Sequence, residues 1–143
     1  MLMEENKDIV RRAIEEIWNK GNMAVADELL AANFVNHDPV STPETYNLEA
    51  YKQGVSDSRT DFPDLHVTIE EQIAERDKVV TRWTCTGTHK GKSGAIDIAP
   101  TGKQVTIEGI TINHIAGGKI VEEWWFRELM VMKLGYKIVP PSK

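Results

Sequence analysis

The chain has 143 residues, enough for one domain whose core buries about two-thirds of the surface that the unfolded chain exposes. Its composition, with 41% hydrophobic and 27% charged residues, is typical of a globular protein, and no stretch approaches the roughly 20 consecutive apolar residues of a membrane span. The net charge of −5, with no cluster of Lys and Arg, argues against nucleic acid or an anionic membrane as a partner, because phosphate binding needs a basic patch.

The first residues and the single cysteine both predict a cytoplasmic protein. The opening segment MLMEENKD is acidic and has no apolar run, so we expect no secretory signal. Cys85 has no second cysteine with which to form a disulfide, which fits a reducing compartment. It lies in the middle of a predicted strand with no adjacent basic residue, so we predict a buried structural thiol rather than a nucleophile.

Helical patterns dominate the first part of the chain. Between residues 4 and 20, apolar residues recur at spacings of one, three and four, which predicts an amphipathic helix with one apolar stripe. Gly21 follows the basic last turn of this helix, and Asn22 can cap a second, shorter helix. Residues 34–39 (FVNHDP) read as a short extended piece ended by proline, and Asn47 can cap a third helix.

After residue 65 the period changes from helical to alternating. Segments 67–73, 79–89, 105–115 and 120–126 are rich in Val, Ile, Thr and Trp and are predicted to be strands. Their connections are too short for the crossovers that parallel strands require, so we expect an antiparallel meander. A short amphipathic helix follows the last strand.

Three helices followed by a meander indicate the α+β class, and we expect a single domain spanning residues 1–143. The helices are predicted to pack in the concavity of one curved antiparallel sheet. A cone-shaped cavity for a small organic ligand is the natural result of this packing.

The turn before the last strand decides which side chains share a face. A two-residue loop of Gly117 and Gly118 would put His114 and Glu122 on opposite faces, whereas a three-residue loop over 116–118 would put them on the same face. We favour the three-residue loop, because its bulge needs a glycine where Gly118 stands. One face then carries an imidazole and two carboxylates among apolar side chains: His114, Ile120, Glu122, Trp124, Phe126 and Glu128. This composition fits a pocket lining, and equally a half-solvated strand.

Several motifs occur in a fixed order along nearly the whole chain. They are FVNHDP (34–39), FPDL (62–65), GTHKG (87–91), PTGK (100–103) and GGKIVEEW (117–124), with LGY and PP near the end. The ordered set resembles the SnoaL-like polyketide cyclase family of the nuclear transport factor 2-like superfamily, whose fold is an α+β barrel. The fold alone does not imply the function, since it hosts isomerases, hydrolases, cyclases and proteins without chemistry.

The resemblance implies a ring closure by intramolecular aldol condensation, with an aspartate four residues after the motif tryptophan as acid and base. Counting from Trp124 reaches Glu128. Counting back from the LG pair is ambiguous, because the chain is shorter there by a residue or two, and it leaves Arg127 open as the alternative, although arginine cannot act as a base at neutral pH. Strand parity favours Glu128 as the catalytic residue. The family's basic or imidazole residue, four before Gly118, falls on His114, which would steady an oxyanion or orient the carboxylate.

Glu128 also has a physical rationale as an acid and base. A carboxyl between Trp124 and Phe126 would be desolvated, which would raise its pKa. The alternative is a solvated carboxylate near the start of the last helix, where the helix dipole favours negative charge. For His114 the alternative is a half-buried histidine bonded to Glu122 or to a backbone group.

Further substrate contacts are expected around this face. Arg82 would bind an enolate oxygen or, as a structural pair, neutralise Glu122. The expected binding residues are Arg82, Glu122, Trp124, Phe126, His37 and His89. The four histidines show no close-spaced ligand pair and no glycine motif for nucleotides is found, so we expect neither a metal nor another cofactor.

The sequence therefore predicts a cofactor-free cyclase or enolisation catalyst that acts on a small polyketide-like carbonyl compound. A non-catalytic small-molecule carrier of the same fold and a hydrolase or isomerase remain open alternatives, and so does whether the chain catalyses a reaction at all. We also expect a homodimer, as the superfamily resemblance implies, through a sheet face bearing Trp83, Thr111 and Trp125.

Overall fold

The computed structural model describes residues 2–41, 43–96 and 98–135. Tyr136 of the LGY motif and the Pro-Pro pair lie outside the described residues. The elements are α1 (Leu2–Ala13), a π-helical turn η1 (Ile14–Trp18), α2 (Met23–Leu29), β1 (Leu30–His37), β2 (Thr45–Asn47), α3 (Leu48–Asp61), β3 (His66–Glu75), β4 (Lys78–Thr88), β5 (Gln104–Ala116), β6 (Lys119–Arg127) and α4 (Met130–Lys133).

The predicted α+β class is confirmed, and β3 to β6 form the predicted antiparallel meander. The strand order is β2-β1-β6-β5-β4-β3, and β1 pairs with β6 in parallel, so the sheet is mixed rather than wholly antiparallel. The parallel pair is possible because β2, α3 and the strands β3 to β5 lie between β1 and β6 in the chain, which makes a long crossover. The sheet stays open, because its edge strands β2 and β3 do not pair with each other.

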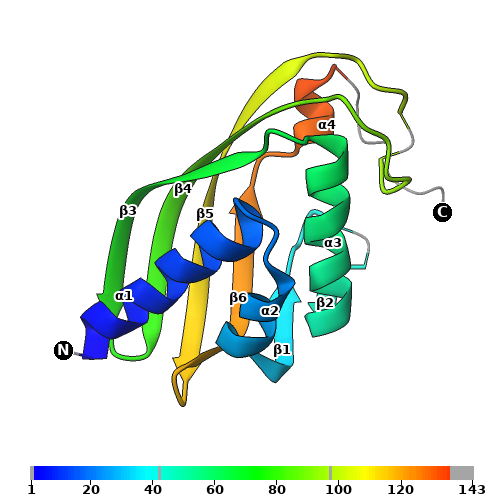
Figure 1. Ribbon diagram of the computed structural model, residues 1–143. Helices are drawn as coiled ribbons and strands as arrows, with labels where there is room; N and C mark the ends of the chain where they lie inside the picture. Colours follow the sequence, from blue (N-terminus) through cyan, green and yellow to red (C-terminus); the bar gives the residue numbers. More distant parts are fainter. Residues whose placement is uncertain (1, 42, 97, 136–143) are drawn as a thin grey trace, which may run out of the picture.

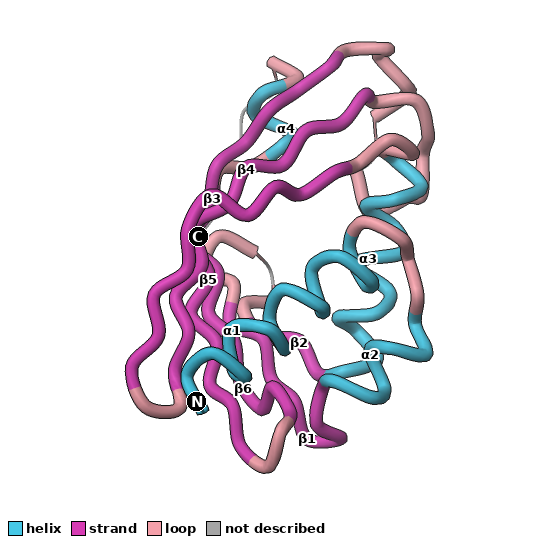
Figure 2. The backbone as a smooth tube through the Cα atoms, turned by 60° about the vertical axis from the view of Figure 1, so that its left-hand side comes forward, coloured by secondary structure: helices cyan, strands magenta, loops and turns pink. Residues whose placement is uncertain are grey.

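The helices lie on one face of the sheet. In Figure 1, α1 crosses in front of the strands, and α3 stands beside β1 and β6. Figure 2, turned by 60°, shows the sheet curving around the side on which the helices gather. The prediction that helices pack in the concavity of a curved sheet is therefore confirmed.

The helix ends follow local rules in two of three cases. Gly21 has a φ of 70° and its amide donates to the Ile17 carbonyl at 3.0 Å, which ends the first helical segment as predicted. The Asn47 carboxamide accepts from the Ala50 amide at 2.9 Å and caps α3. Asn22 precedes α2 without a side-chain capping bond, so that predicted cap is wrong.

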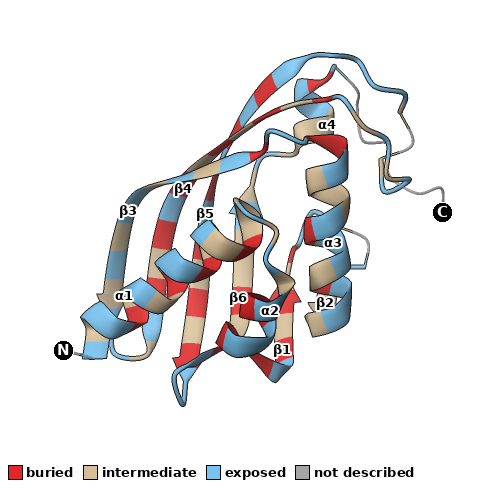
Figure 3. Cartoon of the chain, viewed as in Figure 1, coloured by how far each residue is buried: buried red, intermediate tan, exposed pale blue. Residues whose placement is uncertain are grey.

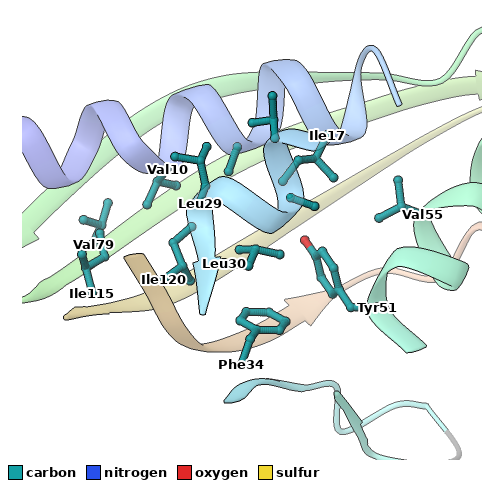
Figure 4. Close-up of a cluster of buried hydrophobic side chains, with 13 residues drawn as sticks. Val10, Ile17, Leu29, Leu30, Phe34, Tyr51, Val55, Val79, Ile115 and Ile120 are labelled. Carbon is teal, nitrogen blue, oxygen red and sulfur yellow. The ribbon is translucent and has the colours of Figure 1, made fainter. Parts of the chain in front are cut away.

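The apolar stripe of α1 and η1 packs on the sheet and on α3 to form the main core. Figure 4 shows this cluster, and Figure 3 shows buried segments of the chain, in red, on the helices and on the strands that they cross. The cluster consists of Val10, Ala13, Ile17, Val25, Ala26, Leu29, Leu30, Phe34, Tyr51, Val55, Val79, Ile115 and Ile120. A second cluster beneath the far end of α3 contains Phe62, Trp83 and Cys85, so the predicted burial of this thiol is confirmed.

The inward face of β4 and β5 is not the predicted one. Trp83 and Thr111, expected on an exposed face, are 9% and 7% exposed, and the Trp83 indole N–H donates to the Thr111 hydroxyl at 2.8 Å. Trp125 packs against Trp18 and Tyr51 of the helical layer. The prediction that these three residues form an exposed interface is wrong, because they are the more apolar of the two alternating sets and therefore face the helices.

The turn between β5 and β6 has two residues, not three. Gly117 and Gly118 have φ angles of 60° and 76°, and Ala116 pairs with Lys119, which is the pattern of a type I′ hairpin turn. The predicted three-residue loop is therefore wrong. His114 nevertheless pairs directly with Glu122, because the ladder shifts by one residue after the Ile115–Ile120 pair.

Both turn glycines need a positive φ, so alanine at either position should be strained. We expect Gly117→Ala and Gly118→Ala each to lower the free energy of unfolding by about 1 kcal/mol, measured by urea denaturation. Gly54→Ala is the matched control, since Gly54 lies within α3 and an added Cβ meets no atom within 4 Å. It should stabilise by roughly 0.5–1 kcal/mol. A clear difference between the two turn variants would contradict the two-residue turn.

Candidate functional site

A cavity of about 660 Å³ lies between the helical layer and the concave side of the sheet. This volume is within the range of small-molecule sites, and the walls are mostly apolar. Aromatic rings contributed by η1, α3, β4 and β6 form much of the lining: Trp18, Tyr51, Trp83 and Trp125.

A buried carboxyl, Glu123, lies in this lining and is 5% exposed. The Asn36 side-chain amide donates to Glu123 Oε1 at 3.0 Å, and the Asn113 side-chain amide donates to Oε2 at 2.8 Å. Asn36 is the register partner of Glu123 in β1, and Asn113 is its partner in β5. Three neighbouring strands thus place one carboxyl between two amide donors in a single row across the sheet.

Burial raises the pKa of Glu123 to about 7, because an ionised carboxylate loses its hydration in the apolar interior. The hydrogen bonds from Asn113 and Asn36 oppose this rise in pKa, since they stabilise the ionised form, and Trp125 and Tyr51 act in the same direction to a smaller extent. The carboxyl is therefore divided between its two protonation states near neutral pH. That is the range in which a general acid and base works best.

An ion pair also belongs to the cavity wall. Arg127, four residues after Glu123 on the same face of β6, donates from Nη2 to Asp38 Oδ2 at 2.6 Å. Asp38 is 1% exposed, so the guanidinium neutralises a carboxylate that would otherwise be buried alone. The Arg127 guanidinium also lies 5.3 Å from the Trp125 ring centroid, within cation–π range.

The structure places Glu128, the predicted acid and base, outside the cavity. Its carboxylate accepts from Lys133 Nζ at 3.0 Å and from the Glu108 amide at 3.0 Å. These hydrogen bonds, that of Lys133 first, hold the pKa of Glu128 below its ordinary value. The predicted cavity position and raised pKa are wrong, because strand parity turns Arg127 inward and Glu128 outward.

Four other predicted site residues gather on the outer face of the sheet. His37 Nε2 lies 2.6 Å from Glu122 Oε2, and its ring stacks on Trp124 with centroids 5.0 Å apart and planes 11° apart. His114 Nε2 lies 2.7 Å from Asp77 Oδ2. The structure does bring His37, Glu122 and Trp124 together, but on the side away from the cavity.

The remaining predicted binding residues also lie apart from the cavity lining. Arg82 Nε donates to Glu71 Oε1 at 2.9 Å, so its partner is on the neighbouring strand β3 rather than Glu122. Phe126 is 52% exposed. His89 is fully buried, and its Nδ1 accepts from the Thr101 amide at 3.2 Å, which is a structural role. Arg82 and Phe126 lie outside the cavity because the alternation of β4 and β6 turns them outward, whereas His89 lies just beyond the end of β4.

Sequence reasoning missed Glu123 because Glu122 precedes it and both faces of β6 carry a carboxyl and a tryptophan. A usable signal was present in Asn36 and Asn113, which are amides within otherwise apolar strands. A buried amide needs a hydrogen-bond partner. A carboxyl within reach of both strands would satisfy that requirement.

Among residues 2–41, 43–96 and 98–135, no three His, Cys, Asp or Glu side chains are grouped so as to hold a metal ion. Across the same ranges, no helix has the length and apolar character needed to cross a membrane.

Comparisons with known proteins agree with this architecture. The sequence pattern of the SnoaL-like polyketide cyclase family matches residues 8–133. A structure described as a candidate polyketide cyclase from Acidithiobacillus ferrooxidans is 27% identical, with a TM-score of 0.76 over 92% of this chain and 93% of that one.

Two further solved structures share the fold at 23% identity. One is described as a candidate SnoaL-like polyketide cyclase from Jannaschia sp., with a TM-score of 0.82 over 96% of this chain and 95% of that one. The other is AclR of Streptomyces galilaeus, described as a candidate hydroxylase, with a TM-score of 0.79 over 93% and 97%. No curated protein matches the sequence significantly.

The raised pKa of Glu123 predicts a specific pH dependence of stability. Between its ordinary pKa of 4.5 and the folded value of about 7, the folded chain holds a proton that the unfolded chain has released. Stability contributed by this group is therefore fully present below pH 4.5 and falls as the pH rises to about 7. Relative to Glu123→Gln, the wild type should lose about 3 kcal/mol across this window, measured by urea unfolding at a series of pH values.

Glu122→Gln provides the control for this measurement. Glu122 is the preceding residue and lies on the outer face beside His37, so its substitution should leave the pH dependence attributed to Glu123 in place. If Glu123→Gln and the wild type kept parallel stability profiles from pH 4.5 to 8, the carboxyl would not have the shifted pKa.

Proposed function

Because the chain belongs to the SnoaL-like polyketide cyclase family, we propose that it is a cofactor-free catalyst of enolisation. Its proposed reaction is an intramolecular aldol-type ring closure on a small polyketide-like carbonyl compound bound in the cavity. The single observation that carries this proposal is a buried carboxyl, Glu123, with a pKa of about 7 in a mostly apolar cavity of small-molecule size.

In the proposed reaction, Glu123 acts first as the base. Its carboxylate removes a proton from the carbon next to a substrate carbonyl, and the enolate that forms attacks a second carbonyl of the same molecule. A carbon–carbon bond closes the ring, and the protonated Glu123 returns its proton to the new alkoxide. The two steps restore the enzyme, so no cofactor or external acid is needed.

The surroundings of Glu123 support this role. The Asn36 and Asn113 amides hold the carboxyl in one orientation, so it is positioned before substrate binds. Trp18 and Trp125 provide flat apolar walls suited to a planar, conjugated ligand. Arg127 lies four residues after Glu123 on the same strand face and also lines the cavity. The N–H groups of Arg127 that do not bond to Asp38 suit a carbonyl or enolate oxygen of the substrate.

A second candidate function rests on Arg127. Of the two residues to which the family's aspartate can correspond, Arg127 faces the cavity and Glu128 does not. Arginine cannot remove a proton at neutral pH, and this departure favours a non-catalytic small-molecule carrier of the same fold. The two candidates differ in whether a bound ketone exchanges its acidic protons.

We expect the wild type to catalyse exchange of the α-protons of 2-tetralone in deuterated water, followed by proton NMR. General-base catalysis typically contributes at least about 100-fold, so Glu123→Gln should slow this exchange about 100-fold or more. Glu122→Gln should exchange like the wild type, since its carboxyl lies on the outer face. Binding of the ketone without exchange above the buffer rate would favour the carrier.

We also propose that the protein works in the cytoplasm and takes neither nucleic acid nor a metal as a partner. The only cysteine, Cys85, is buried and unpaired, which suits a reducing compartment. The net charge of −5 disfavours contact with phosphate backbones.

Our proposal includes a homodimer, formed through the outer face of the sheet rather than the inner face. Ile110 and Phe126 are register partners on β5 and β6 and are 43% and 52% exposed, and Trp124 lies on the same strand face as Phe126. An apolar patch of this kind on an open sheet is typical of an interface. The superfamily resemblance supports a homodimer, while the choice of the outer face rests on these exposed side chains.

The homodimer is tested by light scattering. We expect a dimer mass for the wild type at micromolar concentration and a monomer mass for Phe126→Glu, because the substitution places a charge in the interface. Leu2→Glu is the control: Leu2 is 65% exposed on α1, in the helical layer, and should leave the mass unchanged. A wild-type monomer mass would refute the dimer.

A further inference from the structure

A tryptophan and a tyrosine form a hydrogen-bonded pair beside the carboxyl. Trp18 is the last residue of the π-helical turn η1, and Tyr51 lies in the first turn of α3. The Trp18 indole N–H donates to the Tyr51 hydroxyl oxygen at 2.9 Å, and the two rings meet edge to face with centroids 6.0 Å apart. Both side chains line the cavity.

The Tyr51 hydroxyl can donate only one proton. The indole of Trp18 is a donor and cannot accept, so this proton is free for another acceptor. Tyr51 and Glu123 line the same cavity, and each shifts the pKa of the other, so the carboxyl is the acceptor within range of this proton. The indole therefore fixes the direction in which the hydroxyl donates.

Packing holds the Tyr51 ring in place. Its centroid lies 5.0 Å from the Phe34 ring and 5.7 Å from the Trp125 ring, and the residue is 7% exposed. Figure 4 shows Tyr51 standing above Phe34 with its hydroxyl directed into the cluster. A ring contacted on several sides cannot turn its hydroxyl away from the carboxyl without displacing its neighbours.

Resting on the function proposed above, we infer that Trp18 and Tyr51 are a positioning pair for the catalytic carboxyl. Trp18 orients the Tyr51 hydroxyl, and Tyr51 donates to Glu123 as a third hydrogen bond beside those of Asn36 and Asn113. The pair thereby stabilises the ionised carboxylate that removes the substrate proton. Neither residue needs to touch the reacting atoms for this role.

The π-helical turn is the local structure that brings Trp18 to this position. π-Helical turns are rare, and they occur often at functional sites. η1 runs from Ile14 to Trp18 and directly follows α1, so the turn sets the side of the helix on which the indole emerges. We therefore assign the turn to the same positioning role.

Other ionisable groups face the same cavity from the surrounding elements. Within the described residues they are Asp38, Tyr46, Asp57, Asp61, Cys85 and Arg127. Asp38 and Arg127 neutralise each other, and Asp61 accepts from the Ser93 amide at 2.6 Å. Among the ionisable lining residues that the structure describes, Tyr51 is the one that acts on the pKa of Glu123, which makes it the residue to change.

The test is a titration of the Glu123 carboxyl by carbon-detected NMR in the wild type and in Tyr51→Phe. Removal of the hydroxyl leaves the ring packing intact and withdraws one donor from the carboxylate. The pKa of Glu123 should then rise by about one unit. Trp18→Phe keeps the hydroxyl but releases its orientation, so it should give a smaller rise in the same direction.

Tyr46→Phe is the matched control. Tyr46 also lines the cavity, and its hydroxyl bonds to Ser41 instead of Glu123. Its loss should leave the titration of Glu123 unchanged. In the exchange assay with 2-tetralone, the midpoint of the pH profile should move upward in Tyr51→Phe by the same amount as in the titration.

The outcomes separate this inference from the proposed function. An unmoved Glu123 titration in Tyr51→Phe would overturn the positioning pair, even if exchange by the wild type depends on Glu123. A shifted titration without any exchange by the wild type would leave the pair in place and refute the enzyme. If Tyr51→Phe failed to fold, the same decision would rest on Trp18→Phe, whose titration must also shift.

Discussion

A carboxyl group without water needs hydrogen-bond donors, and this requirement shapes the centre of the molecule. The donors to Glu123 come from the strands on either side of β6, Asn36 in β1 and Asn113 in β5. This arrangement works only if β1 pairs with β6 in the register that sets Asn36 beside Glu123. The same pairing carries β1 on to Asp38, which meets Arg127 at the next part of the cavity wall. The parallel pair that makes the sheet mixed is therefore also what assembles the site.

One extra residue in β6 determines which side chains of this strand line the cavity. Ile115 and Ile120 pair and point into the core, and the ladder then shifts so that His114 pairs with Glu122. Val121 is the residue added between these pairs. After it, Glu123, Trp125 and Arg127 point inward, and the other set points outward. Without this shift every side chain of the strand would change sides, because the period of a strand is two.

The parts of the structure that follow from local pattern were predictable. Helical spacing located the first helix, Asn47 marked the start of α3, and alternation located the four strands of the meander. The site was not predictable in the same way. In the sequence EEWWFRE each face receives a carboxyl and an aromatic ring, so composition cannot tell the inner face from the outer one. The bulge at Val121 decides which face of β6 points inward. Valine is common in regular strands, so the sequence gives no sign of this bulge, whereas the two glycines before it do predict the turn.

The ion pair between Asp38 and Arg127 leaves little net charge in the cavity wall that also holds Glu123. A cation near a carboxyl favours the ionised form and lowers its pKa. Arg127 lies on the same strand face as Glu123, so an unpaired guanidinium would oppose the effect of burial. Asp38 is almost completely buried, and it engages Arg127 at 2.6 Å. The arginine therefore contributes a nearly neutral wall, and the causes that set the pKa of Glu123 are its burial and its hydrogen-bond donors. A cavity wall that carries an arginine can in this way keep a carboxyl able to exchange protons four residues earlier on the same strand.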